Sequence, residues 1–582
     1  MATSKDGVTV IEDGEILIEK DVPIPLADGH WVYCNVFRPN RDGLFPPIVV
    51  FTPYGKDSDV AVDFKRYWDF VLRDHPEVVR EGSTGKYLTW EVPDPERWTP
   101  KGYAIVVVDA RGTGKSPGFY EVMSPLQTRE YYDAIEWAGV QPWSNGKVGL
   151  LGVSYLAIKQ WQVAALQPPH LAAMIPWEGM FDHYRDAYRH GGIYSSFFLK
   201  LIWDTQITIN QNGNQGSPYR DRFTGAVSTG RAIDPELLLG NLANVYEAGL
   251  HHRFDDAYFK LRTPIAERIV TPFLSAGNWG GLGLHLRGNV EGFARAASRQ
   301  KWLEMHTDTH FASMYLPDAL ALQMKFFGHF LKGEDNGWDK QPPLLLTIRD
   351  PRGHFRRTES EWPLARTQWT RYYLDAKDRT LGLNAASEPG QGTYDALGDG
   401  ITFHTAPFEV DAEFTGPVAA KLFVSTSGSD IDLFLTLRLF DPDGREVTFV
   451  GANDPRAPIS QGWLRVSHRK TDSALSRSYK PYHPHDERLA VNPGEVYEVD
   501  VEIWPTSIVV PASYRLALTV GGRDFERPDA QGLMKGSGIF LHNDLLDRPT
   551  DVFDCAGSIH TGRGTASYLL MPLISAPSDL MQ

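Results

Sequence analysis

Short apolar runs that alternate with helical stretches dominate the chain up to about residue 367. The runs occupy residues 48–51, 104–108, 148–151, 171–175, 273–275 and 302–305. Continuous apolar segments of this length are typical of strands buried on both faces of a mostly parallel sheet. Helical patterns, such as those at residues 129–140 and 155–166, lie between the runs. This alternation predicts a doubly wound α/β domain.

The alternation breaks between residues 182 and 263, where aromatic, Asn- and Gly-bearing sequence carries several helical patterns. An insertion of this size between two strands favours a cap over a further part of the sheet. We therefore predict a core made of residues 1–180 and 264–367, with a helical cap at residues 181–263.

From residue 368 to residue 582 the pattern becomes that of an all-β domain. Strand-like segments recur at short spacing, with turn signals such as Asp-Pro-Asp-Gly at residues 441–444 between them. Such a pattern is typical of a β-sandwich or jelly roll. Three parts account for 582 residues, a length that would fit about four domains of ~150 residues.

Charge and composition exclude several classes of partner. The chain has 58 Lys and Arg against 73 Asp and Glu, a formal net charge of −15. Nucleic acids and anionic membranes are bound by a basic excess or stripe, which is absent here. No apolar run approaches the ~20 residues of a membrane span, and residues 1–14 lack the apolar core of a signal peptide. We expect a cytoplasmic protein that binds neither nucleic acid nor membrane; a trimmed signal peptide and a homo-oligomer stay open.

The strongest chemical signal is the segment from Lys147 to Ala157. It reads as a short apolar strand, then Gly152-Val153-Ser154, then the start of a helix. A serine on such a sharp strand-to-helix turn projects its hydroxyl above the sheet, and the helix N-terminus offers amide donors to an oxyanion. A serine that merely caps the helix is the alternative. The position after a buried strand favours a catalytic nucleophile, although Leu156 replaces the last glycine of Gly-x-Ser-x-Gly.

A series of motifs in a fixed order accompanies this turn. They are Thr52-Pro53-Tyr54-Gly55-Lys56, Asp109-Ala110-Arg111-Gly112-Thr113-Gly114, Gln141-Pro142-Trp143-Ser144, Gly416-Pro417-Val418, Gly462-Trp463-Leu464-Arg465 and Glu502-Ile503-Trp504-Pro505-Thr506-Ser507. In these motifs the chain resembles the cocaine esterase and X-Pro dipeptidyl-peptidase group, the CocE/NonD family of α/β-hydrolases. The resemblance implies an α/β-hydrolase core with an inserted helical cap and a C-terminal jelly-roll domain. It also implies a serine hydrolase without a cofactor.

Matched position by position, the resemblance implies roles for four residues. Ser154 is the nucleophile, and the Tyr54 hydroxyl and the Tyr155 backbone N–H stabilise the oxyanion. The base should be a histidine on a late loop, since the chain order on this fold is Ser, acid, His. His310 matches best, and His306, at the end of the preceding strand, is its rival.

The acid departs from the family pattern. An Asp is expected after the Gly-Trp segment that follows residues 271–276, but Gly280 occupies its position. A triad needs a carboxylate to hold the imidazole tautomer and to stabilise the imidazolium. The strand after the nucleophile helix also ends toward the histidine, which makes Glu178 the first candidate for a relocated acid. Asp308 and Asp182 are its rivals.

Two motifs suggest other chemistry and are interpreted as structural. Residues 111–116, Arg-Gly-Thr-Gly-Lys-Ser, resemble the end of a phosphate-binding loop, but Asp109 replaces its leading glycine. Residues 482–486, Tyr-His-Pro-His-Asp, lie in a Pro-rich stretch that we expect to be a surface loop. Neither this segment nor His306, Asp308 and His310 forms a recognisable metal-ligand pattern.

The sequence therefore predicts a serine hydrolase that splits a small-molecule carboxylic ester, or an amide, through an acyl-enzyme. Trp177, Tyr184 and Trp279 are expected to line the substrate pocket. Within the family, the alternative is an X-Pro dipeptidyl aminopeptidase or an α-amino-acid ester hydrolase or acylase. An alternative of another class is a catalytically weakened protein that binds a ligand or carbohydrate, which the missing acid at Gly280 would explain.

Overall fold

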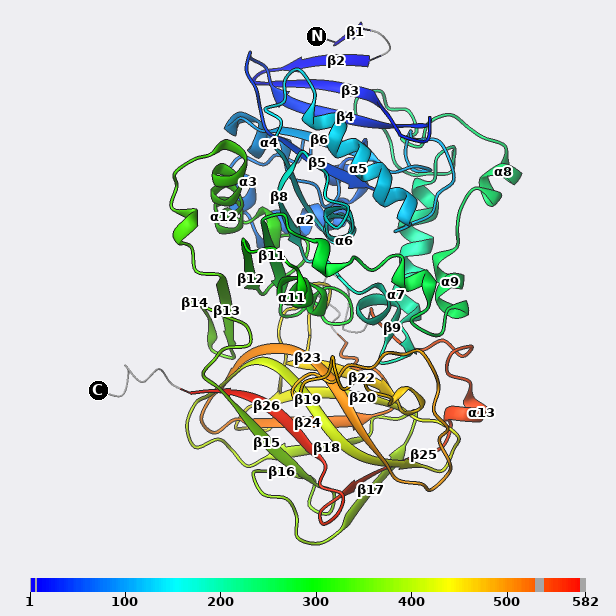
Figure 1. Cartoon of the computed structure of the whole chain (residues 1–582), viewed down its shortest axis with the longest axis vertical. Helices are drawn as coiled ribbons and strands as arrows, with labels where there is room; N and C mark the ends of the chain where they lie inside the picture. Colours follow the sequence, from blue (N-terminus) through cyan, green and yellow to red (C-terminus); the bar gives the residue numbers. More distant parts are fainter. Residues whose placement is uncertain (1, 6–7, 529–538, 576–582) are drawn as a thin grey trace.

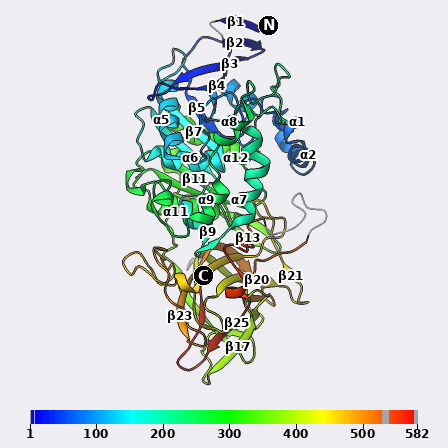
Figure 2. The same cartoon turned by 90° about the vertical axis from the view of Figure 1, so that its right-hand side faces the viewer.

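A computed structural model describes residues 2–5, 8–528 and 539–575. Figure 1 shows a mixed α/β part stacked on a second part made almost wholly of strands. Figure 2 shows the same two parts from the side, with α7 (Ser196–Ile202) running down the α/β part toward the junction.

A long sheet forms the centre of the α/β part. Its strands lie in the order β1 (Ala2–Lys5), β2 (Val8–Asp13), β3 (Ile16–Pro25), β4 (Trp31–Pro39), β6 (Ala104–Asp109), β5 (Pro47–Thr52), β7 (Val148–Val153), β8 (Leu171–Trp177), β11 (Phe273–Asn278), β12 (Lys301–His306), β13 (Leu344–Asp350) and β14 (Gly353–Glu359). Strands β6 to β13 run parallel, and the edges on both sides are antiparallel. Because parallel strands share one carboxyl edge, β7, β8, β11 and β12 deliver their last residues to the same side of the sheet.

Burial on both faces explains why the strands read as continuous apolar runs. In β5, Ile48 and Val50 pack into one hydrophobic cluster, whereas Val49 and Phe51 pack into the cluster on the other face. Helices supply the covering layers: α5 (Pro125–Gly139), α6 (Tyr155–Ala164), α11 (Leu286–Arg295) and α12 (Pro317–Phe327). The six predicted strand runs lie within strands of this core, and the predicted helices at 129–140 and 155–166 coincide with α5 and α6 except at their last residues.

Two insertions interrupt the core. The one between β8 and β11 contains α7 and the short helices α8 (Pro235–Gly240), α9 (Val245–His251) and α10 (Ala257–Lys260). The one between β5 and β6 contains α1 (Val60–Asp63), α2 (Lys65–Asp74), α3 (Glu77–Arg80) and α4 (Pro95–Trp98). Sequence analysis predicted only the first of these insertions. Three of the four helices in the second insertion, α1, α3 and α4, have only four residues, about one turn, which leaves no apolar period to recognise.

In its described residues, the lower part is made of β strands with the short helices α13 (Thr550–Phe553) and η9 (Val466–His468). Its principal strands are β15 (Thr367–Asp375), β19 (Ala412–Thr426), β20 (Asp432–Phe440), β22 (Ser460–Arg465), β23 (Tyr497–Val510), β24 (Arg515–Gly521), β25 (Ala556–Thr561) and β26 (Tyr568–Ile574). They pair antiparallel around a hydrophobic core of their own. The pair Arg349 and Ile508 joins β13 to β23 and so connects the two parts.

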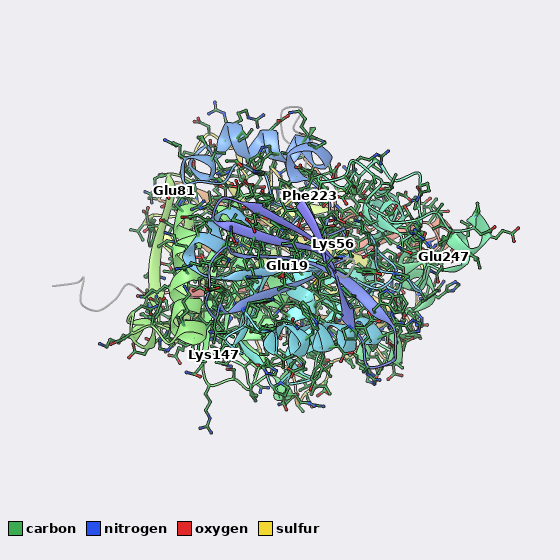
Figure 3. The ribbon with its side chains drawn as sticks, turned by 90° about the horizontal axis from the view of Figure 1, so that it is seen from above. Glu19, Lys56, Glu81, Lys147, Phe223 and Glu247 are labelled. Carbon is green, nitrogen blue, oxygen red and sulfur yellow. The ribbon has the colours of Figure 1, made fainter. Side chains whose placement is uncertain are left out.

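The segment that resembles a phosphate-binding loop is a structural turn. Asp109 accepts the backbone N–H groups of Lys56 and Lys115, at 2.6 and 2.9 Å. The Lys115 ammonium binds Asp21 of the core and Asp221 of the insertion, each at 2.8 Å. Figure 3 shows Lys56 of this network near the centre of the view from above. These ion pairs therefore connect the insertion to the core.

The expectation of a surface loop at residues 482–486 is wrong for its histidines. His483 and His485 are buried, and they lie with His190 and His468 where the insertion meets the lower part. We call these four residues the junction cluster. Its burial results from tertiary packing, because the insertion covers a loop whose composition is that of an exposed one.

Among the described residues, no helix combines the length and apolar character that crossing a bilayer requires.

Candidate active site

Ser154 lies at the sharp turn between β7 and α6. Its backbone has φ 57° and ψ −117°, a conformation that is strained for a residue with a side chain. The Ser154 N–H donates to the carbonyl oxygens of Trp177 and Glu178, both at 3.1 Å, and this fixes the turn. A Cβ added at Gly152 would lie 2.6 Å from the Leu156 Cβ, so the turn needs a glycine there. Local geometry thus presents the serine hydroxyl at the carboxyl edge of the sheet.

Two side chains contact the Ser154 hydroxyl. His285 Nε2 lies 3.1 Å from Oγ, and the Tyr54 hydroxyl forms a hydrogen bond with the serine. Burial raises the pKa of Tyr54 well above its ordinary value, so the phenol stays a neutral donor. Tyr155 is the first residue of α6, where a backbone N–H points out of the helix start. The site therefore offers one hydroxyl and one amide donor beside the serine.

His310 is held between two carboxylates. Its Nδ1 lies 2.9 Å from Glu178 Oε2, and its Nε2 lies 3.0 Å from Glu91 Oε1. Although burial opposes the charged ring, Glu178 and Glu91 raise the pKa of His310 to about 10. In this arrangement His310 is an imidazolium at neutral pH.

Glu178 follows β8 directly and has a positive φ of 49°. Besides His310, its carboxylate contacts His306 Nε2 at 2.9 Å and the Ser313 hydroxyl at 2.8 Å. Burial opposes ionisation, but the two histidines hold the pKa of Glu178 well below its usual range. His306, the rival base, is enclosed by Glu178 and Glu304, and its ring stacks on Trp177 at 4.9 Å.

The other two candidate acids lie elsewhere. Asp182 pairs with Arg185 at 2.8 Å. Asp308 is half-exposed, and His75 lies 3.9 Å from its carboxylate. In the part of the chain that the structure describes, Glu178 is the one candidate of the three whose carboxylate contacts His310.

The lower part of the molecule occupies the position of the expected Asp. A Cβ at Gly280 would lie 2.2 Å from the Gly451 Cα. The same loop is fixed in place, because Ala452 accepts the His310 N–H at 2.9 Å and donates its own N–H to Gly280 at 3.2 Å. No side chain fits at position 280 unless this loop moves.

Sequence analysis missed His285. It follows the glycine-rich segment after β11 and precedes α11, and its ring lies parallel to that of His310 at 5.2 Å. Burial and the neighbouring His310 lower the pKa of His285 to about 3, so it is neutral. Its Nδ1 is buried without a hydrogen-bond partner among the described residues. The signal that was available is its place five residues after Gly280, in the loop that leaves the carboxyl end of a core strand.

A cleft of about 300 Å³ opens over Ser154. Its walls come from both insertions, from the loop after β11 and from the lower part; they include Tyr67, Trp90, Phe198, Leu201, Ile202, Leu284, Phe311, Asn453 and Ile539. The three aromatic residues expected to line the pocket pack inside the protein instead. Trp177 donates to Ser313, Tyr184 donates to the Arg253 carbonyl and Trp279 donates to the Thr347 carbonyl. The aromatic walls of the cleft come largely from the insertion between β5 and β6.

Glu178, His285 and His310 also bring three metal-ligating side chains close together, with one ligand atom of each within 4.8 Å of the others. Hydrogen bonds already use this set, because Glu178 binds His310 and His285 contacts Ser154. These hydrogen bonds account for the short distances between the three side chains.

Comparison with known proteins identifies the family of this chain. Residues 28–312 match the family model of X-Pro dipeptidyl-peptidase (S15 family), and residues 336–533 match that of the X-Pro dipeptidyl-peptidase C-terminal non-catalytic domain. The cocaine esterase of Rhodococcus sp. (strain MB1 Bresler) is 26% identical over 97% of this chain and 99% of its own length.

Solved structures extend the comparison. An aminopeptidase from a Thaumarchaeota archaeon shares the fold, with a TM-score of 0.70 at 15% identity over 96% of this chain and 97% of its own. A CocE/NonD family hydrolase from Staphylococcus aureus has a TM-score of 0.83 and 32% identity, over 97% of this chain and 96% of its own. The chain belongs to the CocE/NonD family of hydrolases, with an α/β-hydrolase-like fold and a C-terminal non-catalytic domain of β strands.

Proposed function

We propose that the protein is a serine hydrolase that cleaves small-molecule carboxylic esters through an acyl-enzyme on Ser154. The observation that carries this proposal is the position of the Ser154 hydroxyl. It lies on a strained turn between Tyr54 and His285, in a cleft that is also lined by His310, whose ring is hydrogen-bonded to the buried Glu178.

In the proposed reaction, Ser154 Oγ attacks the ester carbonyl and its proton passes to Nε2 of a neutral His310. Glu178 holds Nδ1 and stabilises the imidazolium that forms. The Tyr54 hydroxyl and the Tyr155 N–H donate to the oxyanion. His310 then gives the proton to the departing alkoxide, and the same steps with water release the acid.

His285 is assigned a different part. It contacts Ser154 in this structure, but it lacks a carboxylate on Nδ1 and its low pKa makes it a weak base. We propose that it holds the serine hydroxyl before substrate binds and that Oγ turns toward His310 for the reaction.

The division into core, cap and jelly roll is part of the same proposal. The insertion at residues 181–263 contributes Phe198, Leu201 and Ile202 to the cleft, as a cap would. The lower part contributes Asn453 and Ile539, and its antiparallel strands support a jelly roll. A cytoplasmic location and a homo-oligomer stay predictions.

The test compares labelling and turnover in single variants. A fluorophosphonate probe should label the wild type but not Ser154→Ala, and Ser154→Ala should not hydrolyse p-nitrophenyl butyrate, which the wild type turns over. His310→Ala should lose about 10³-fold or more in kcat, and His285→Ala about 10-fold. Labelling that survives Ser154→Ala would refute the nucleophile. A reversed order of the two histidine variants would make His285 the base.

The second candidate is an X-Pro dipeptidyl aminopeptidase or an α-amino-acid ester hydrolase. The Glu91 carboxylate in the cleft favours it, because such substrates carry an ammonium group that a carboxylate binds. Comparing an X-Pro-nitroanilide with p-nitrophenyl butyrate decides between the two. Turnover of either substrate above the Ser154→Ala background excludes a protein that only binds a ligand or carbohydrate.

A further inference from the structure

Glu91 has no part in the reaction described above, yet it contacts the proposed base directly. Its Oε1 lies 3.0 Å from His310 Nε2, the nitrogen that must accept the serine proton. Glu178 already occupies Nδ1, so both ring nitrogens of His310 face carboxylates. With a proton on each nitrogen, the ring has no lone pair with which to act as a base.

The position of Glu91 is built into the fold. It lies in the loop between α3 and α4 with a positive φ of 63°. Its backbone carbonyl accepts the N–H of Val153 at 3.2 Å, which ties the loop to the residue before the nucleophile. A carboxylate held in a strained conformation at this place points to a function in the site.

The surroundings of Glu91 disfavour its charge. Glu91 and His310 line both the cleft and an adjoining chamber of about 30 Å³, whose other walls include Tyr67, Trp68, Trp90, Phe311 and Tyr315. Oε2 is buried without a hydrogen-bond donor of good geometry among the described residues. Burial raises the pKa of Glu91, although His310 lowers it. The carboxylate therefore depends on His310 for most of its stabilisation.

We propose that Glu91 is a positioning residue that holds His310 in a protonated resting form, from which the base is freed only when the pair loses a proton to solvent. The N–H bond at His310 Nε2 breaks and a water molecule takes the proton, which leaves a neutral imidazole beside the Glu91 carboxylate. The freed lone pair on Nε2 then accepts the proton of Ser154. This proposal deepens the proposed function and depends on it.

The side chains around Glu91 and His310 determine the pH dependence that the proposal predicts. Glu178 and His285 face His310, whereas Trp90, Tyr54 and Tyr315 lie around Glu91. Removing Glu91 removes one of the two carboxylates that favour the imidazolium. Because the active form needs a neutral His310, activity should then appear at lower pH.

The test measures the pH dependence of kcat/KM for p-nitrophenyl butyrate, and of fluorophosphonate labelling of Ser154, in the wild type and in Glu91→Gln. We expect the acid limb of both profiles to move down by about one pH unit, as for the loss of one carboxylate beside a titrating group. Glu91→Asp keeps the charge on a shorter side chain. The acid limb of its profile should therefore lie between those of the wild type and Glu91→Gln. If Glu91→Gln does not fold, Glu91→Asp against the wild type decides the same question.

Asp94→Asn is the matched control. Asp94 is a buried carboxylate three residues further along the loop, where it caps α4 and binds Ser83. Asparagine keeps the cap, so the limb should stay where the wild type has it. An unmoved limb in the Glu91 variants, or an equal shift in Asp94→Asn, overturns the role of Glu91. A wild type whose Ser154 does not label and that turns over no ester overturns the proposed function as well.

Discussion

Two groups of buried histidines lie in this molecule, and their surroundings drive them to opposite charge states. At the active site, His306 and His310 face carboxylates. In the junction cluster, His468 and His485 face guanidinium groups and one another, with their Nδ1 atoms 3.1 Å apart. The comparison shows that burial alone does not set the charge of a histidine.

The active-site histidines are enclosed by acids. Burial opposes their charge, but Glu304 and Glu178 raise the pKa of His306 to about 9. His285 lies beside them without a carboxylate on Nδ1, and burial lowers its pKa to about 3. Two hydrogen-bonded carboxylates on each ring distinguish the charged histidines, His306 and His310, from the neutral His285 in the same site.

The junction histidines are enclosed by cations. Burial, together with the nearby Arg465, Arg189 and Arg488, lowers the pKa of His468 to about 3. Burial and Arg185 likewise hold the pKa of His485 well below its ordinary value. These rings are neutral at pH 7, so the insertion and the lower part pack against each other around uncharged histidines.

The largest expected effect comes from removing the acid that both charged histidines share. Glu178→Gln keeps the size of the side chain but cannot stabilise the imidazolium, so kcat should fall by about 10³–10⁴-fold. Steady-state hydrolysis of p-nitrophenyl butyrate measures this, with circular dichroism to verify the fold. Asp308→Asn, at the half-exposed rival acid, should leave kcat within about twofold. Near-wild-type kcat in a folded Glu178→Gln would remove the acid from the mechanism.

The second effect is on stability at high pH. The pKa of His306 is about 9 in the folded protein and about 6.5 in the unfolded chain. Protonation of His306 therefore stabilises the fold, and this stabilisation is complete below about pH 6.5. This contribution, about 3 kcal/mol, is lost as pH rises from about 6.5 through 9. His306→Gln should therefore lose less stability than the wild type between pH 6 and pH 9 in urea unfolding. His354→Gln, at an exposed histidine of β14, should behave like the wild type. Parallel losses in His306→Gln and the wild type would contradict this account.

The smallest expected effect is a loss of folding stability at low pH, rather than at high pH, and it comes from His468 of the junction cluster. The folded-state pKa of His468 lies near 3, so below about pH 6.5 the unfolded chain binds a proton that the folded chain does not. The wild type should lose about 2 kcal/mol through this group between pH 7.5 and pH 5. His468→Gln should keep most of that stability, as measured by urea midpoints at the two pH values. A midpoint that falls as steeply in the variant as in the wild type would show that another group causes the acid sensitivity.

Local patterns in the sequence were sufficient for much of the fold. The six apolar runs are core strands because a strand buried on both faces leaves a continuous signal. The turn at Ser154 was predictable for a similar reason, since glycine, serine and a helix start are adjacent in the chain. The contact between Glu178 and His310 also agrees with the sequence-based reasoning about which strand ends meet at one edge, although the role of Glu178 stays a proposal.

Contacts between distant loops were not predictable. Glu91 and His285 belong to loops more than 60 residues from Ser154, and no spacing rule brings them to it. The expected pocket residues Trp177, Tyr184 and Trp279 are aromatic, but an aromatic residue suits a core as well as a cleft. The burial of His483 and His485 likewise depends on an insertion that begins 300 residues earlier.

The sequence by itself determined the strands, the turn that presents Ser154 and the absence of an acid at position 280, because each depends on neighbouring residues. Only the tertiary structure decided why that acid is absent, since the backbone of Gly451, from the lower part, fills the space. It also decided the charge states, because a buried imidazole takes its charge from whichever carboxylates or guanidinium groups the fold packs against it.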